Sequence, residues 1–337
     1  MSVILSFSSY DSFSSAGILI LVTWGSMKVL FYTNELREEW DNFIENSKNG
    51  TFMLKRAYME YHSDRFTDFS LMFYKERKLV AVMPASLHEQ QVRSHGGLTY
   101  GGIISDTSMK TKLMLEVFEA LIGFLKEHDI TSLLYKRVPA IYHLYPADED
   151  LYALFRNNAV LVRRDIATAV DFLAEQIRLP KGRRAQISRS KREGVIVQKS
   201  EEFEDFINLE NEILSLYHNA KAVHSAKELR NLYADFPEEI QLFVANLKNK
   251  MIAGVLVFVT KNTVHTQYMA ADEIARYTGG LDLLVAHLLE KYSKTKRYFD
   301  FGISTEKDGT YLNEGLIAQK EGFGGRGIVY DTYEISL

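Results

Sequence analysis

A strand–turn–strand pattern occurs twice along this chain of 337 residues, and this repetition restricts the possible folds more than any other feature. The first copy is LMFYKERKLVAVMPASL, residues 71–87, and the second is LFVANLKNKMIAGVLVFV, residues 242–259. In each copy two apolar runs flank a short charged turn, which is typical of a β-hairpin. Because the copies lie about 170 residues apart, we expect one supersecondary unit to be used twice.

The elements that follow each hairpin also repeat. Both halves continue with a strand-like segment, a glycine pair, an amphipathic helix and another strand. Apolar residues at helical spacing predict the two helices at 110–127 and 280–292. We therefore predict a fold of the α/β class with α+β mixed sheets, in which residues 27–172 and 173–337 form two tandem domains. Two unrelated α+β domains are the alternative explanation.

The first 26 residues differ from the rest of the chain. They are rich in serine and contain one apolar run, residues 16–24, which is too short to span a bilayer. A signal peptide would require a Lys or Arg before this run, but none is present there, and Asp11 precedes the run instead. We expect residues 1–26 to be a poorly ordered extension, with a first strand beginning at Met27. A signal or anchor segment is the less favoured alternative.

The amino-acid composition excludes several classes of function. The net charge of −4 gives the chain no overall positive field for binding nucleic acid, so any phosphate contact must be local. The best local candidate is RLPKGRRAQISRSKR, residues 178–192, which contains no acidic residue. The absence of cysteine rules out disulfides and thiolate chemistry and is consistent with a cytoplasmic protein.

Several familiar chemistries lack their motifs. There is no H-E-x-x-H zinc motif and no G-x-x-x-x-G-K-[ST] phosphate loop, and GISTE around Ser304 lacks the second glycine of a nucleophile elbow. We therefore expect no metal. Direct acyl transfer needs neither metal nor covalent nucleophile, only an aligned donor, a deprotonated amine and dipoles for the oxyanion.

Three segments near the C-terminus carry a family resemblance: YFDFGIS, LNEGLIAQKEGFGG and IVYDTYEISL. They resemble the GNAT superfamily of acyl-CoA N-acyltransferases, in the double form of FemAB-like proteins and polysaccharide-locus acetyltransferases. The resemblance implies two GNAT-like domains, in which the fourth and fifth strands splay apart around the pantetheine of acyl-CoA. The pyrophosphate would sit on a helix N-terminus, where free N–H groups favour anions.

The donor site expected from this resemblance is the segment RYTGGL. Arg276, Gly279 and Gly280 would bind the pyrophosphate, although Leu281 stands where the family has a small residue. FemAB-like proteins instead take an aminoacyl group from tRNA and add it to a cell-wall precursor. Arg183 and Arg184 would then bind phosphate, because arginine forks match its geometry, unless they are only a solvated charged surface.

The remaining site candidates are polar residues at strand and helix ends. Lys320 stands where FemAB-like proteins keep a lysine near the reacting groups, so we predict that it is catalytic together with Asp300 and Tyr268. We expect the following residues to bind substrate: His95, Tyr100, His224, Gln267, Ser304 and Asn313. Capping, core packing or ion pairing would explain each of them without a ligand.

The prediction is an N-acyltransferase that moves an acyl group, with acyl-CoA as the leading donor, to an amine of an amino sugar or cell-envelope precursor. An aminoacyl-tRNA-dependent enzyme of peptidoglycan synthesis is one alternative. A non-catalytic protein that binds a glycan or nucleotide sugar is the other. We expect no DNA partner and no transmembrane segment.

Overall fold

The computed structural model describes residues 22–337 except 25, 176–177 and 219–221. Most of the predicted N-terminal extension, residues 1–21, therefore lies outside the described residues. Its end does not: Val22–Trp24 form strand β1, which pairs antiparallel with β2. The expectation that the whole of residues 1–26 is poorly ordered is therefore wrong for this strand, because it adds to the edge of a sheet.

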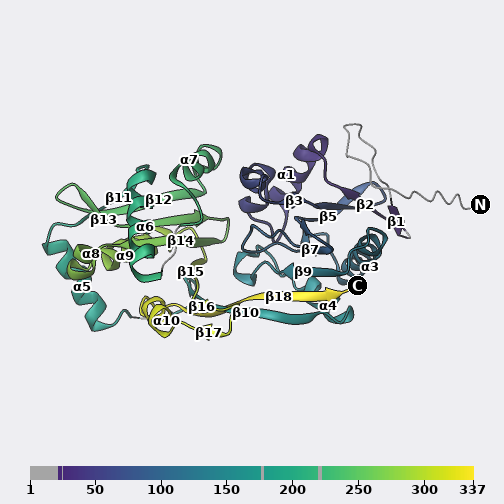
Figure 1. Cartoon of the computed structure of the whole chain (residues 1–337). Helices are drawn as coiled ribbons and strands as arrows, with labels where there is room; N and C mark the ends of the chain where they lie inside the picture. Colours follow the sequence, from purple (N-terminus) through teal and green to yellow (C-terminus); the bar gives the residue numbers. More distant parts are fainter. Residues whose placement is uncertain (1–21, 25, 176–177, 219–221) are drawn as a thin grey trace, which may run out of the picture.

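Two lobes lie side by side, joined along one edge by two long strands (Figure 1). The first lobe contains these elements: β1, β2 (Met27–Phe31), α1 (Arg37–Asn46), α2 (Arg56–Met59), β3 (Thr67–Asp68), β4 (Leu71–Lys75), β5 (Lys78–Met83), β6 (Ser86–His88), β7 (Gln91–Arg93), β8 (Ile104–Ser105), α3 (Thr111–Glu127), β9 (Ser132–Lys136) and α4 (Glu149–Arg156). Short 3-10 helices occupy Asn34–Leu36, Phe52–Leu54, Glu60–His62 and Ala140–Tyr142.

The second lobe and the joining strands follow. They comprise β10 (Val160–Asp171), α5 (Lys181–Arg192), β11 (Ile196–Ser200), α6 (Phe203–His218), α7 (Ala226–Asp235), β12 (Ile240–Leu247), β13 (Lys250–Val259), β14 (Thr263–Ala271), α8 (Glu273–Thr278), α9 (Gly280–Tyr292), β15 (Tyr298–Ile303), β16 (Thr305–Glu306), β17 (Tyr311–Leu312), α10 (Glu314–Glu321) and β18 (Arg326–Ser336). Helix α9 has the same bounds as the helix predicted at 280–292. Helix α3 begins one residue after the start of the helix predicted at 110–127.

Both predicted hairpins are present, as β4–β5 and β12–β13. The described strands form mixed sheets, which confirms the predicted fold class. One sheet has the order β1-β2-β4-β5-β8, and the larger has the order β11-β12-β13-β14-β15-β10-β18-β9-β7-β6-β3. Each half also contributes one parallel pair next to its long helix, β7–β9 in the first and β14–β15 in the second. The repeated order of elements is thus visible in the strand pairing.

The two long strands cross between the halves. Strand β10 precedes the boundary predicted at residues 172 and 173, yet it pairs with β15 of the second half. Strand β18, at the end of the second half, pairs with β9 of the first. Because β10 and β18 also pair with each other, a single sheet runs through both lobes. The boundary itself remains a prediction, since each half completes its sheet with a strand from the other.

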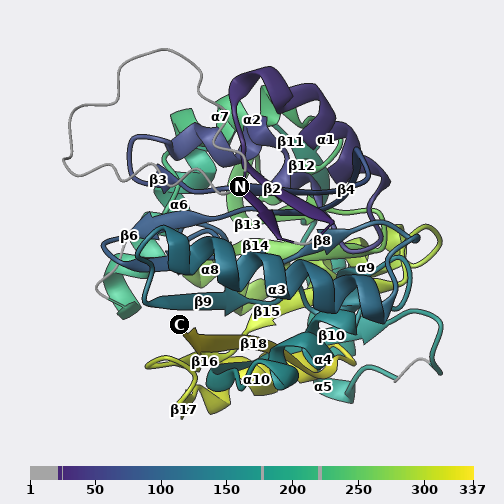
Figure 2. The same ribbon diagram turned by 90° about the vertical axis from the view of Figure 1, so that its right-hand side faces the viewer.

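Apolar packing also joins the halves. One core cluster combines Trp40, Phe52 and Tyr58 with aromatic residues of the second half. The ring of Phe52 lies 5.3 Å from that of Phe236 and 5.6 Å from that of Phe258. Each buried aromatic side chain is worth roughly 1.5–3 kcal/mol, so this interface holds the lobes together. A separate core lies under α3, which covers one side of the first lobe (Figure 2).

In the described part of the chain, no helix combines the length and the apolar character needed to cross a bilayer.

Candidate functional site

A cleft opens where two parallel strands separate. Strands β14 and β15 pair at only three positions, from Thr263 opposite Tyr298 to His265 opposite Asp300. Beyond this point the strands diverge, and a cleft of about 330 Å³ lies between residues 265–269 and 301–303. Helix α10 closes one side of it with Leu316 and Lys320. This is the strand gap that the resemblance to GNAT proteins implies.

Local backbone geometry fixes the start of the gap. Gly302 has a φ of +71°, a conformation that side chains rarely tolerate, and its N–H donates to Oδ1 of Asp300 at 2.8 Å. A Cβ at this position would lie 3.1 Å from Cε1 of His265. Glycine therefore lets the strand turn beside the imidazole without displacing it.

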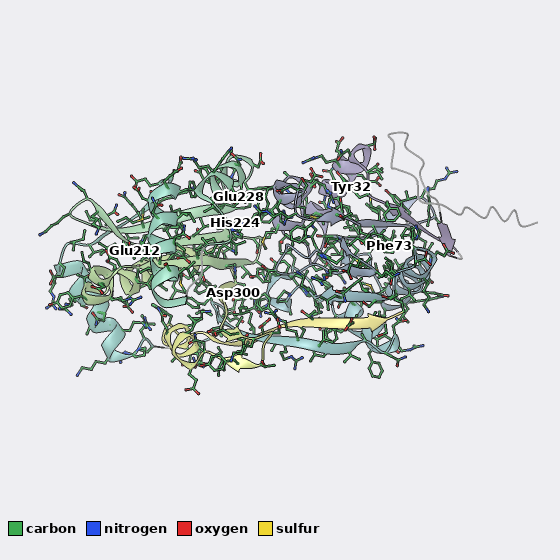
Figure 3. The ribbon with its side chains drawn as sticks, viewed as in Figure 1. Tyr32, Phe73, Glu212, His224, Glu228 and Asp300 are labelled. Atoms are coloured by element: carbon green, nitrogen blue, oxygen red, sulfur yellow. The ribbon has the colours of Figure 1, made fainter. Side chains whose placement is uncertain are left out.

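Asp300 lies behind His265 at the base of the cleft. Its carboxylate is fully buried and accepts hydrogen bonds from Nδ1 of His265 at 2.9 Å, from the Tyr142 hydroxyl at 2.7 Å and from the Tyr330 hydroxyl. Burial alone would raise the pKa of Asp300, but the hydrogen bonds and charge attraction from His265 and the tyrosine hydroxyls hold it below its usual value. Asp300 is thus an ionised acceptor in the middle of the molecule, where the lobes meet (Figure 3).

This arrangement sets the chemistry of His265. Because an ionised Asp300 can only accept, Nδ1 of His265 carries a proton, and in the neutral ring the lone pair is therefore on Nε2. The side chain of His265 is 12% exposed and lines the cleft. The pair therefore has the geometry of a general base held by a carboxylate. Asp300 was predicted from the sequence, whereas His265 was not, because its position opposite Asp300 depends on the strand register.

Lys320 faces the same cleft from α10. Lys320 is 4% exposed, and its ammonium donates to the backbone oxygens of Gly302 at 2.9 Å and Ile303 at 2.6 Å. Burial lowers the pKa of Lys320 to about 8, although the charge of Asp300 opposes this shift. An ammonium has three N–H donors, so one is left for a ligand. The predicted catalytic role is consistent with this position and remains a prediction.

A row of hydrogen bonds leads from the cleft to the other lobe. Tyr268 lines the cleft, and its hydroxyl lies 2.6 Å from Nδ1 of His224. The other ring nitrogen of His224 lies 2.9 Å from the hydroxyl of Tyr61, which belongs to the first half. Burial lowers the pKa of His224 to about 4, so its ring is neutral at pH 7. His224 thus bridges two tyrosines and does not itself line the cleft.

Two further polar residues line the cleft. Gln267 was predicted from the sequence. Glu210 was not, because its α6 helix reads as an ordinary amphipathic segment. Glu210 is 6% exposed, burial raises its pKa to about 7, and its Oε2 has no hydrogen-bond partner among the described residues. It is a further titratable group in the cleft, beside His265 and Lys320.

Four predicted substrate residues have structural roles or lie elsewhere. Tyr100 is in the core, with its hydroxyl 3.4 Å from Thr51, and packs on Tyr142. His95 is buried against His62 and Phe66 in the first lobe. Asn313 caps α10 by accepting from the N–H of Leu316 at 3.0 Å. Ser304 is buried below the strand end, and its hydroxyl has no partner in the described part of the chain. These contacts favour structural explanations for Tyr100, His95 and Asn313.

The expected pyrophosphate site is packed against another helix. Gly279 has a φ of +80°, and a Cβ there would lie 2.6 Å from the backbone oxygen of Gln186 in α5. Gly280 begins α9 and packs on the side chain of Ile252. Asp282 adds a carboxylate to the first turn of α9. A covered helix end that already carries a negative charge is a poor place for phosphate.

The two arginines predicted to bind phosphate, Arg183 and Arg184, lie in different environments. Arg183 forms an ion pair with Asp282, donates to the backbone oxygen of Gln319 at 3.0 Å and lies 3.6 Å from the ring centroid of Phe323. These contacts favour a structural role for Arg183, in which it ties α5 to α9 and α10, and phosphate binding by Arg183 stays a prediction. Arg184 is exposed, with its Nε bonded to the backbone oxygen of Leu179, and Arg276 is exposed on α8.

Among the residues described, no group of three or more His, Asp or Glu side chains is arranged to hold a metal ion.

Comparison with known proteins agrees with this geometry. Residues 181–311 match the acetyltransferase (GNAT) domain family. The crystal structure of FemX superposes with a TM-score of 0.65 at 11% identity, covering 92% of this chain and 97% of that one. L-PGS from Bacillus licheniformis gives 0.54 at 13% identity, covering 76% and 81%. The C-terminal domain of a putative lysylphosphatidylglycerol synthetase from Agrobacterium fabrum gives 0.53 at 12% identity, with the same coverage. No curated protein matches the sequence.

Proposed function

We propose that the chain, whose residues 181–311 match the acetyltransferase (GNAT) domain family and whose fold is similar to that of FemX, transfers an aminoacyl group to an amine in the cleft between β14 and β15. The observation that carries the proposal is the buried Asp300–His265 pair at the point where the strands separate, with Lys320 across the cleft. The fold similarity to FemX and to lysylphosphatidylglycerol synthetases favours an aminoacyl group over a simple acetyl group.

In the proposed reaction, Nε2 of His265 takes a proton from the attacking amine. The nitrogen forms a bond to the carbonyl carbon of an aminoacyl ester, the ester C–O bond breaks, and the leaving oxygen receives a proton. The free N–H of Lys320 stabilises the oxyanion. If the amine arrives as an ammonium, one proton leaves per turnover. General-base help is typically worth 10²–10⁴ in rate, and one oxyanion donor about 10²–10³.

The identity of the donor rests on the N-terminus of α9. A pyrophosphate would need the backbone of Gly279 and Gly280, which α5 covers, and would meet the carboxylate of Asp282. This favours aminoacyl-tRNA over acyl-CoA, because the ester of aminoacyl-tRNA lies at the end of the RNA chain and has no pyrophosphate beside it. Acyl-CoA is the second candidate, because the family that matches residues 181–311 is a GNAT acetyltransferase domain. The proposed acceptor is a cell-envelope precursor, and the proposed site of action is the cytoplasm, where aminoacyl-tRNA is made.

Single-turnover donor cleavage tests the proposal. Protein in excess is mixed with radiolabelled aminoacyl-tRNAs or with acetyl-CoA, with and without a panel of small amines, and product amide is measured. We expect amide from aminoacyl-tRNA and none from acetyl-CoA, and loss of product in His265→Gln. Amide from acetyl-CoA alone would establish the second candidate. If neither donor is cleaved but the protein binds a glycan or nucleotide sugar, the result would instead support a non-catalytic binding protein.

A further inference from the structure

A second cleft adjoins the first at Tyr330. It has a volume of about 270 Å³ and shares three lining residues with the first cleft: Thr99, Ile303 and Tyr330. Three basic residues line it: Lys136 at the end of β9, Arg137 directly after it, and Arg163 from β10. Two carboxylates also line it, Asp165 and Asp331, and each is paired with an arginine, Arg163 and Arg164 respectively. The two clefts therefore lie next to each other and share one tyrosine and one strand end, the first beside the second-half strands and the other beside the first-half strand β9.

Two of these three cations already have carboxylate partners. Arg137 pairs with Asp148 and, at 3.2 Å, with Asp150. Arg163 pairs with Asp165 at 2.6 Å and Asp308 at 2.9 Å. Their charges are largely balanced within the fold, so neither requires a ligand.

Lys136 differs from them. Its ammonium donates to two backbone oxygens, those of Leu98 and, at 3.5 Å, Gly96, and Lys136 takes part in none of the ion pairs among the described residues. Burial, together with the charges of Arg93 and Arg163, lowers the pKa of Lys136 to about 8. A partly buried cation that lies beside two other cations and has no carboxylate partner is costly. An anion placed in this cleft would remove that cost.

We infer that the cleft at Lys136 binds a carboxylate or phosphate group of the acceptor, whose amine reaches His265 past Tyr330. This inference rests on the proposed function and specifies the acceptor as an amine that also carries a negative charge. The first half thereby contributes a binding group to a reaction whose other groups come from the second half. Arg163, whose side chain is 37% exposed, lines the same cleft and can donate a hydrogen bond to the anion, although its charge is balanced by its carboxylate partners.

A structural role for Lys136 is the competing explanation. Its bonds to Gly96 and Leu98 hold the loop that precedes β8, and Lys136→Met could loosen that loop without any effect on an anion. The experiments must therefore detect the anion itself, and they need a variant that leaves those two hydrogen bonds intact. Arg163→Gln is that variant, since Arg163 does not contact either carbonyl.

The first experiment measures anion binding without any reaction. In protein labelled with ¹³C at lysine Cε, the signal of Lys136 is assigned by its loss in Lys136→Met, and its pKa is followed by NMR with inorganic phosphate or with acetate. A bound anion should raise the pKa of Lys136 by about one unit, because an opposite charge within a few ångströms favours the ammonium. Lys126, exposed on α3, is the internal control. An unchanged Lys136 pKa at saturating concentrations of both anions would overturn the inference.

The second experiment uses the acyl-transfer assay. Glycylglycine is compared with glycinamide, and O-phosphoethanolamine with ethanolamine, so the two pairs distinguish a carboxylate from a phosphate. Arg163→Gln and Lys136→Met should raise KM for the charged member of one pair roughly 10–100-fold, as expected for loss of a charge-assisted hydrogen bond, and leave the neutral member and kcat nearly unchanged. Lys126→Met should change neither. Equal KM values for charged and neutral acceptors in wild type would refute the inference while leaving the proposed function intact. If wild type transfers no acyl group, the proposed function fails and the NMR titration alone decides the anion site.

Discussion

Replacement of Asp300 by Asn is the sharpest test of the proposed base. The carboxylate accepts four hydrogen bonds: Oδ1 accepts from the N–H of Gly302, and Oδ2 accepts from His265, Tyr142 and Tyr330. An Asn side chain has nearly the same size but only one accepting oxygen. If its amide oxygen faces Gly302, its NH2 group faces Nδ1 of His265 and forces that nitrogen to accept. The proton then moves to Nε2, and the base loses its lone pair.

The opposite orientation is worse, because it places the Asn NH2 group against the N–H of Gly302 without an acceptor between them. We therefore expect the first orientation and a fall in turnover of about 10²–10⁴, the range of general-base contributions. Loss of charge-assisted hydrogen bonds, worth about 1.5–3 kcal/mol each, is partly offset because a buried charge disappears. The free energy of unfolding should drop by only a few kcal/mol, since the two tyrosine hydroxyls, 3.1 Å apart, can bond to each other.

The stability difference has its own pH dependence. The pKa of Asp300 is lowered in the folded protein from an ordinary value of 3.8, so the carboxylate stabilises the fold fully above about pH 5. This contribution is lost as pH falls below 3.8 and through the folded pKa. The gap in unfolding free energy between wild type and Asp300→Asn should therefore be constant near neutrality and shrink in acid.

The assay is single-turnover transfer across a pH range, with urea unfolding beside it. Asp150→Asn is the matched control, because Asp150 is also buried and accepts from a tyrosine, Tyr135, but does not contact His265. A stable Asp300→Asn protein with wild-type turnover and an unchanged pH profile would refute the assignment of His265 as base.

Three other outcomes follow from the structure. Lys320→Met should lower turnover about 10²–10³-fold yet keep nearly wild-type stability at pH 7. The pKa of Lys320 is lowered to about 8, so its buried charge costs roughly 3 kcal/mol of folding free energy, and removing this cost offsets the two lost hydrogen bonds. Thermal unfolding and transfer rates check this, and normal turnover would exclude a catalytic role. Arg183→Ala should reduce stability by about 1–3 kcal/mol without changing the salt dependence of donor binding, whereas Arg184→Ala should leave stability unchanged; an altered salt slope in Arg183→Ala would restore its phosphate role. The pKa of His95 is lowered to about 3 and that of His224 to about 4 by burial, so the unfolded chain binds more protons below pH 6.5 and stability should fall from pH 6.5 towards pH 4; urea midpoints for His95→Gln should show a shallower fall, and an identical slope would contradict the buried neutral ring.

The sequence predicted what depends on local pattern. Period-two and period-3.6 apolar spacing placed the hairpins and α9 correctly, and the segment around Gln267 and Tyr268 was assigned to the right strand end. His265 was missed because one histidine in an apolar strand has no local signature. Its importance comes from lying opposite Asp300 in a parallel pair, 35 residues away.

The role of α5 could not be derived from the sequence for a similar reason. Seven basic residues in 178–192 resemble a phosphate-binding surface, and nothing local shows that Arg183 faces inward. Only the packing of α5 on α9 gives that side chain a carboxylate, a carbonyl and an aromatic ring. Contacts between segments about 100 residues apart decide which charges face solvent.

The crossing of β10 and β18 has a consequence for how the protein is made. Strand β9 pairs with β18 from Ser132 opposite Ser336 to Lys136 opposite Thr332, so contacts close over about 200 residues. During synthesis the first lobe can form its hairpin and α3, but one edge of β9 stays unpaired until the last strand leaves the ribosome. Such long-range pairing is slow and leaves an open strand edge exposed to other chains. Deleting the final strand should therefore leave two unpaired edges, on β9 of the first lobe and on β10 beside the second, and we expect such a truncated protein to depend on a chaperone.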